Sequence, residues 1–124
     1  MATMSGRFNT ISLVADEALT AHTFVTLSAD AEAAYAAAVG DDAIGVTLGA
    51  ADAGKMVTVQ TDGIAMVKAN EAISAGAAVS TDAAGEAIPA ASGEARLGYA
   101  LEAAGGAGVI ISVLLKPAGA DVPA

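Results

Sequence analysis

The sequence contains no cysteine and no tryptophan, and aromatic residues make up only 3% of its 124 residues. Without cysteine the chain can form no disulfide framework, and it can offer neither a thiol nucleophile nor a cysteine ligand to a metal. With so few aromatic rings it has little material for a deep ligand pocket of the usual aromatic-lined kind. These absences argue against the common enzyme and cofactor-binding classes.

Basic residues are also scarce. The chain has five lysines and arginines against 14 aspartates and glutamates, which gives a net charge of −9. The five cations are scattered along the sequence: Arg7, Lys55, Lys68, Arg96 and Lys116. A nucleic-acid-binding protein needs a cationic patch to displace counterions from phosphates, so we expect no nucleic-acid partner.

The sequence has no apolar run of 18 residues, and no apolar run follows Arg7 near the amino terminus. It therefore predicts neither a membrane-spanning helix nor a secretory signal, and no membrane partner is expected.

Short runs of β-branched residues between turn-forming residues are what the sequence does contain. Residues 44–48 and 55–61 are separated by Gly49 and Gly54 and followed by Asp62-Gly63, which is typical of a hairpin of two strands. Similar runs predict strands at residues 10–14, 23–27, 96–101 and 109–115. The fold class is therefore all-β with little helix.

An internal repeat links the two halves of the chain. Residues 15–21 (ADEALTA) and 69–75 (ANEAISA) lie 54 positions apart, and four of the seven positions are identical. The match extends in both directions and predicts two copies of one β unit, at about 10–60 and 64–113. Because each copy alone would leave an apolar face in water, we expect a single β domain over residues 10–115, either a small barrel or a sandwich.

The repeat also bears on residues 28–39, whose many alanines favour a helix. The corresponding stretch of the second copy contains Gly85 and Pro89, which would break a helix. We therefore favour a turn followed by a short strand through Tyr35, with a helix as the alternative. One turn differs between the copies, since His22 stands where the second copy has Gly76.

The order and spacing of several short motifs resemble the capsid cement proteins of tailed phages, also called head decoration proteins. The motifs are SAGAAV at 74–79, DAAGEA at 82–87, LGYAL at 97–101, VIISV at 109–113, and IGV at 44–46 followed by AADAGKMVTV at 50–59. The resemblance covers roughly residues 10–115.

This resemblance implies a non-enzymatic structural protein of the virion with no cofactor. Such a protein would bind the major capsid protein on the outer surface of the head and stabilise the expanded shell. The resemblance also implies a homotrimer on the capsid and synthesis in the cytoplasm of the bacterial host. An acidic surface suits an outer position, because packaged DNA would repel it.

Two other functions remain open at this stage. One is a generic β-rich surface or adhesive module. The other is a biotinyl or lipoyl carrier domain, because residues 65–76 around Lys68 faintly resemble the modified hairpin of that family. The single histidine, His22, and the aspartates Asp41, Asp42 and Asp52 are interpreted as turn or surface residues, so no catalytic or metal site is predicted.

The two ends of the chain lie outside the repeats. Residues 1–9 are predicted to form an arm that grips the capsid through Met4, Arg7 and Phe8, since aromatic and guanidinium side chains are enriched at interface hot spots. A disordered terminus is the alternative. Residues 116–124 are predicted to be a flexible tail.

Overall fold

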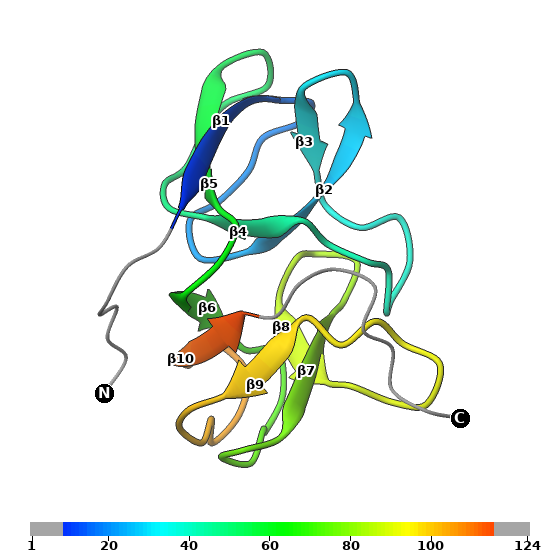
Figure 1. Ribbon diagram of the computed structural model, residues 1–124, viewed down its shortest axis with the longest axis vertical. Helices are drawn as coiled ribbons and strands as arrows, with labels where there is room; N and C mark the ends of the chain where they lie inside the picture. The colour runs from blue at the N-terminus through cyan, green and yellow to red at the C-terminus, as the bar shows by residue number, and fades with distance from the viewer. Residues whose placement is uncertain (1–8, 116–124) are drawn as a thin grey trace.

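The computed structural model describes residues 9–115, and every regular element in this range is a β-strand (Figure 1). Consequently, the described residues include no helix that is long and apolar enough to cross a membrane. The strands are β1 (Thr10–Ala15), β2 (Phe24–Ala29), β3 (Glu32–Ala34), β4 (Gly45–Thr47), β5 (Met56–Gln60), β6 (Ile64–Lys68), β7 (Ala78–Thr81), β8 (Ala87–Pro89), β9 (Gly98–Ala100) and β10 (Ile110–Leu115). The all-β prediction is confirmed.

The first five strands close into a barrel in the order β1-β3-β2-β4-β5. β1 pairs with β5 in antiparallel register and with β3 in parallel register, and these two pairings close the ring. Alternate side chains of the strands point inward, and Leu13, Val25, Val57 and Val59 are buried together in one cluster. In Figure 1 this barrel forms the upper half of the molecule.

The last five strands form a second sheet in the order β6-β10-β9-β7-β8, which is the lower half of Figure 1. It repeats the pairing of the barrel strand by strand: Thr10↔Gln60 corresponds to Ile64↔Leu114, Val25↔Gly45 to Val79↔Gly98, and the parallel pair Ala15↔Ala33 to the bridge Ala69↔Ala87. The prediction of a fold built from two copies of a β unit is confirmed.

Two local predictions can be compared with the structure. The hairpin is present, since β4 pairs with β5 in antiparallel register. Residues 28–39 hold a turn and the short strand β3 rather than a helix, but the strand ends at Ala34, so the prediction that it runs through Tyr35 was wrong. The N–H of Tyr35 leaves the ladder and donates to the carboxylate of Glu17, while the Tyr35 hydroxyl accepts the N–H of Thr20 at 2.8 Å.

The turn that lacks its glycine in the first copy keeps the same backbone shape. His22 has a φ of 64°, and Gly76 at the equivalent position has a φ of 83°. The neighbouring hydrogen bonds also match, because the His22 N–H donates to Thr47 O and the Gly76 N–H donates to Ala100 O. Strand pairing on either side therefore imposes a left-handed backbone conformation at this position, whatever the side chain.

The barrel joins the second sheet through the backbone of residues 22–24. In the barrel the N–H of Val14 donates to Ala31 O at 2.8 Å, which helps to close the ring. At the equivalent place in the second repeat, Lys68 N–H instead donates to His22 O at 2.9 Å, and Phe24 N–H donates to Gly85 O at 2.7 Å. The inserted segment separates β6 from the turn at Gly85, so the second repeat stays an open sheet.

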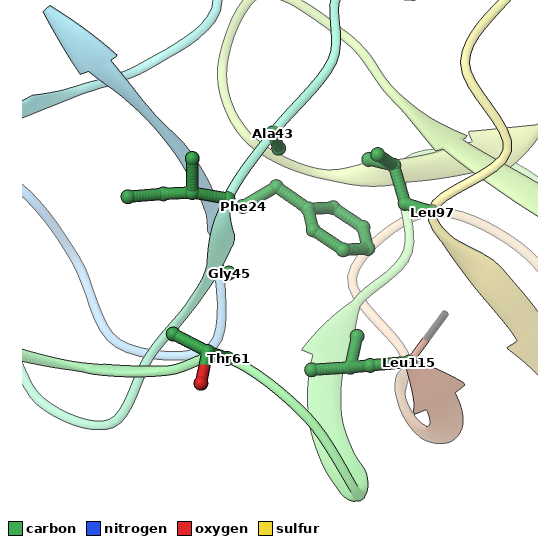
Figure 2. Close-up of a pocket in the computed structure, with 7 residues that line it drawn as sticks. Phe24, Ala43, Gly45, Thr61, Leu97 and Leu115 are labelled. Carbon is green, nitrogen blue, oxygen red and sulfur yellow. The ribbon is translucent and has the colours of Figure 1, made fainter. Parts of the chain in front are cut away.

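Phe24 is the side chain that this insertion carries into the second repeat. It is 1% exposed and belongs to a core cluster made mostly of second-repeat residues, including Val67, Val79 and Ile111. Figure 2 shows its ring pointing toward Leu97 and Leu115. The equivalent residue of the second copy is Ala78, so the two repeats do not contact each other through equivalent surfaces.

Candidate functional site

The three hollows described below offer few groups that could carry out chemistry. The cavity at the junction of the repeats has a volume of about 10 Å³ and is lined by Phe24, Ala43, Ile44, Gly45, Thr61, Leu97 and Leu115 (Figure 2). That volume is at the limit for a single water molecule. Two open hollows beside the loop between β4 and β5 have volumes of about 340 and 470 Å³, and Asp52 is the one titratable residue that lines them.

The polar residues singled out in the sequence, His22, Asp41, Asp42 and Asp52, lie outside the strands. The Asp41 carboxylate accepts the N–H of Ala38, and the backbone carbonyl of Asp52 accepts the N–H of Lys55. His22 is half-buried in its turn. Among residues 9–115, no group of three or more histidines, aspartates and glutamates is arranged to hold a metal ion.

Lys68, the residue that a carrier domain would modify, does not lie at the tip of a hairpin. It ends β6, and its ammonium lies 3.3 Å from the carboxylate of Glu86. Its own N–H is bonded to the inserted segment at His22. This placement differs from the exposed turn at which carrier domains hold their modified lysine.

The sheet edges are largely occupied, so a partner cannot simply add a strand to them. Every strand of the barrel has a neighbour on both sides. In the second sheet the outer strands β6 and β8 are bridged by Ala69↔Ala87, and the segment 22–24 fills the gap beside them. Docking on the described residues must therefore depend on side chains rather than on strand addition.

The described surface is strongly acidic. Residues 9–115 contain all of the carboxylate side chains except that of Asp121, which makes 13, but only three of the cations, Lys55, Lys68 and Arg96. The difference is ten negative charges. Such a surface repels phosphate backbones and favours partners with exposed lysines and arginines.

The outward surface of the second repeat is more apolar than that of the first. The side chains of β6, β9 and β10 that alternate away from the core are Ile64, Met66, Lys68, Tyr99, Ile110, Ser112 and Leu114, and we call this set the outer face. The equivalent residues of the barrel are Thr10, Ser12, Val14, Val46, Met56, Thr58 and Gln60. Thus Ile64, Met66 and Leu114 stand at three positions that are polar in the barrel, whereas Lys68 stands where the barrel has Val14.

Both ends of the described chain meet at the linker between the repeats. The Asn9 N–H donates to Asp62 Oδ1 at 2.6 Å, and its side-chain amide donates to Asp62 Oδ2 at 2.8 Å. At the other end, the N–H of Leu115 donates to Gly63 O at 2.9 Å. Asn9 and Leu115 therefore both lie at the linker that precedes β6.

The predicted capsid-contact residues Met4, Arg7 and Phe8 lie outside the described residues, as does the predicted tail at 116–124. Sequence reasoning missed the outer face. A signal for it exists in the repeat itself, since Ile64 and Met66 align with Thr10 and Ser12 at the 54-residue offset.

Comparisons with known proteins agree with this architecture. A sequence model of a family described as phage cement protein matches residues 5–116. No curated protein matches the sequence. Among solved structures, the head fiber gp8.5 N base of bacteriophage phi29 is similar, with a TM-score of 0.73 at 20% identity, over 94% of this chain and 100% of that one. At that identity the structural match shows a shared fold.

Proposed function

Because the chain belongs to the phage cement protein family, we propose that it is a non-enzymatic head decoration protein. In this proposal it binds the major capsid protein on the outer surface of the shell and stabilises the expanded head. The observation that carries the proposal is the family match over residues 5–116, which spans both repeats. The composition of the hollows described above, which contain one titratable residue, is compatible with it.

The physical basis of such a function is a preformed body that binds without large rearrangement. Most contacts in the fold are between strands that are distant in sequence, and the core cluster that contains Phe24 spans both repeats. Rigid partners lose little conformational entropy on binding, so more of the contact free energy appears as affinity. Many copies that each bridge neighbouring capsid subunits would then add their binding free energies to the stability of the shell.

The predicted arm supplies the specific contacts in this proposal. Arg7 and the apolar side chains Met4 and Phe8 precede Asn9, which the Asp62 carboxylate fixes at the linker. A guanidinium can form paired hydrogen bonds with capsid carboxylates, and an aromatic ring provides a large apolar contact. The acidic body favours a capsid surface that carries basic side chains around this contact.

The proposal includes a homotrimer on the capsid and an outer position on the virion, after synthesis in the cytoplasm of the bacterial host. The acidic surface of the protein favours a place on the outside of the shell, because the packaged DNA inside repels negative charge. The oligomeric state can be measured on decorated heads by counting the copies in each cluster by electron cryo-microscopy.

Binding of the purified full-length chain to expanded heads that lack it tests the function. We expect co-sedimentation with expanded heads, saturation at a fixed number of copies per capsid subunit, and a higher temperature of head rupture. Arg7→Ala should weaken binding, and Lys55→Ala, which removes an exposed cation on the barrel, serves as the matched control. Absence of saturable binding to expanded heads would refute the proposal.

A further inference from the structure

We propose that the open hollow beside Thr58 on the barrel binds a glutamate side chain of a capsid subunit. The methylene groups of that glutamate lie on the apolar wall of the hollow, and its carboxylate accepts the N–H of Thr58. The choice of partner rests on the proposed function, whereas the chemistry of the site rests on the described residues alone.

The second repeat contains the same site with a carboxylate of its own in place. The Ser112 N–H donates to Glu102 Oε2 at 3.2 Å, and the Ser112 hydroxyl lies close to the same carboxylate. Glu102 belongs to the loop that follows β9, so its side chain reaches from that loop to the third residue of β10. The fold therefore brings a carboxylate to a backbone N–H at this place.

The barrel has the same backbone arrangement there. The N–H of Leu48 donates to Thr58 O at 3.0 Å, and the N–H of Leu101 donates to Ser112 O at 2.9 Å. Both contacts continue the antiparallel ladder of the preceding strands, so Thr58 is the equivalent of Ser112. Gly49 follows Leu48 at the position where the second repeat has its glutamate.

The barrel keeps the donor and lacks the acceptor. In an antiparallel strand the N–H and C=O of one residue point to the same side, so the Thr58 N–H points toward the loop of Leu48 and Gly49. On that side, no acceptor among residues 9–115 bonds this N–H. A Cβ on Gly49 would meet no atom within 4 Å, so the space that a carboxylate side chain needs is open.

The lining of the hollow suits a glutamate. The volume is about 340 Å³, and the lining residues, none of them acidic, are Leu48, Gly49, Ala50, Met56, Val57 and Thr58. Met56 is 61% exposed and offers an apolar surface to two methylene groups. An ionised carboxylate forms a stronger hydrogen bond with an N–H than a neutral carbonyl does.

A capsid subunit is the partner that charge favours. The described surface carries ten more negative than positive charges, so it repels a carboxylate unless the groups around that carboxylate are basic. A capsid surface with lysines and arginines around one glutamate meets this condition, whereas a second copy of this acidic chain does not. The contact would also fix the register of the protein on the shell.

Gly49→Glu tests the site without capsids, because it gives the barrel the residue of the second repeat. The measurement is the hydrogen exchange of the Thr58 amide in the full-length protein by nuclear magnetic resonance. We expect this amide to exchange at least about tenfold more slowly than in the native chain, because a bonded amide exchanges only after local opening. Gly49→Ala supplies no acceptor and should leave the rate unchanged.

Ala53→Glu is the matched control for charge. Ala53 is exposed in the same loop and lines neither open hollow, so the added carboxylate has the same charge but does not occupy the site. Circular dichroism verifies that the variants are folded, and Gly49→Asp replaces Gly49→Glu if the latter is not. An equal Thr58 exchange rate in folded Gly49→Glu and Ala53→Glu would overturn the site.

The same pair of variants tests the partner. The internal carboxylate of Gly49→Glu competes with the capsid glutamate, so its binding to expanded heads should weaken at least about tenfold in sedimentation. Ala53→Glu should weaken binding by less than about threefold, because an exposed charge outside the contact is screened by salt.

Each outcome of the sedimentation experiment decides the choice of partner. Equal binding by the two variants would overturn the capsid as the partner. A changed oligomeric state of Gly49→Glu in solution, with head binding retained, would assign the hollow to a second copy and would also overturn it. If the native chain does not bind heads, the proposed function and this partner fail together, whereas the exchange of the Thr58 amide still decides whether the hollow accepts a carboxylate.

Discussion

Ala31 and Gly85 occupy the same turn of the two repeats, with φ values of 55° and 78°. In both, the turn joins two strands that pair in the same register, Leu27 opposite Ala33 and Thr81 opposite Ala87. A glycine adopts positive φ without strain, whereas an alanine is strained there by roughly 1 kcal/mol. The pairing of the flanking strands is therefore strong enough to hold an unfavourable residue in the turn.

Ala31→Gly should raise the stability of the protein. Ala31 is exposed, so the substitution removes no buried contact, and it relieves the strain at positive φ. We expect the free energy of unfolding to increase by about 0.5 to 1 kcal/mol, measured by urea titration. The reciprocal variant Gly85→Ala should be clearly destabilising, because the new Cβ would lie 2.7 Å from Phe24 O and from the Tyr35 ring. A loss of stability in Ala31→Gly would contradict this explanation.

The turn illustrates what the sequence could predict. The 54-residue offset placed a turn and a short strand in residues 28–39 against their helix propensity, because Gly85 and Pro89 exclude a helix in the second copy. Propensity at the level of single residues could not exclude it, since Ala33 and Ala34 of β3 are good helix formers. The end of β3 could not be predicted because it depends on Glu17, which follows the neighbouring strand β1 and accepts the Tyr35 N–H.

Gly45 and Gly98 should not tolerate a side chain. They are equivalent residues, and a Cβ on either would collide with the backbone carbonyl of the neighbouring strand, Gln60 O or Leu114 O. The same Cβ atoms would approach Val59 Cγ1 within 2.7 Å and Val113 Cγ1 within 2.9 Å. Because both strands are fixed in a sheet, we expect Gly45→Ala and Gly98→Ala to lose at least about 2 kcal/mol of unfolding free energy.

Gly49→Ala provides the control for the glycine variants. It lies in the loop after β4, and a Cβ there would meet no atom within 4 Å. Its unfolding free energy should change by less than about 0.5 kcal/mol. Equal losses at Gly45 and Gly49 would show that the close approach between the strands is not what matters.

Phe24→Ala should destabilise the whole fold and not only the barrel. The ring fills the core of the second repeat, and its removal would leave a cavity where the strands are already separated by residues 22–24. Truncations of buried phenylalanine typically cost about 3 to 5 kcal/mol, against a usual total of about 5 to 15. The measurement is a denaturant titration followed by two probes. The matched control is Leu27→Ala on the same strand, since Leu27 is 55% exposed.

The junction shows where sequence reasoning reaches its limit. Phe24 aligns with Ala78, and that difference signals that the two copies are not packed alike. The alignment does not reveal that Phe24 enters the other repeat, because this depends on β6 moving away from the turn at Gly85 to admit the backbone of residues 22–24. The same alignment also shows that polar residues of the barrel correspond to apolar residues of the outer face. It does not show that Val46 and Gln60 of the barrel are buried, and the comparison can be interpreted only once that is known.

Asp62→Ala should weaken capsid binding more than it weakens the fold. The substitution removes the two carboxylate acceptors of Asn9 and leaves the bonds from Thr61 to the Asn9 carbonyl, so Asn9 would be held less firmly. Ordering Asn9 on the capsid then adds a conformational cost that the native chain does not have, which corresponds to a loss of affinity of roughly three- to tenfold. The temperature of unfolding should change little, because Asp62 and its bonds are exposed.

Glu71→Ala removes an equally exposed carboxylate away from the linker and controls for the change in net charge. Sedimentation with expanded heads measures both variants, and equal affinities for the two would show that the clamp between Asn9 and Asp62 has no part in capsid binding.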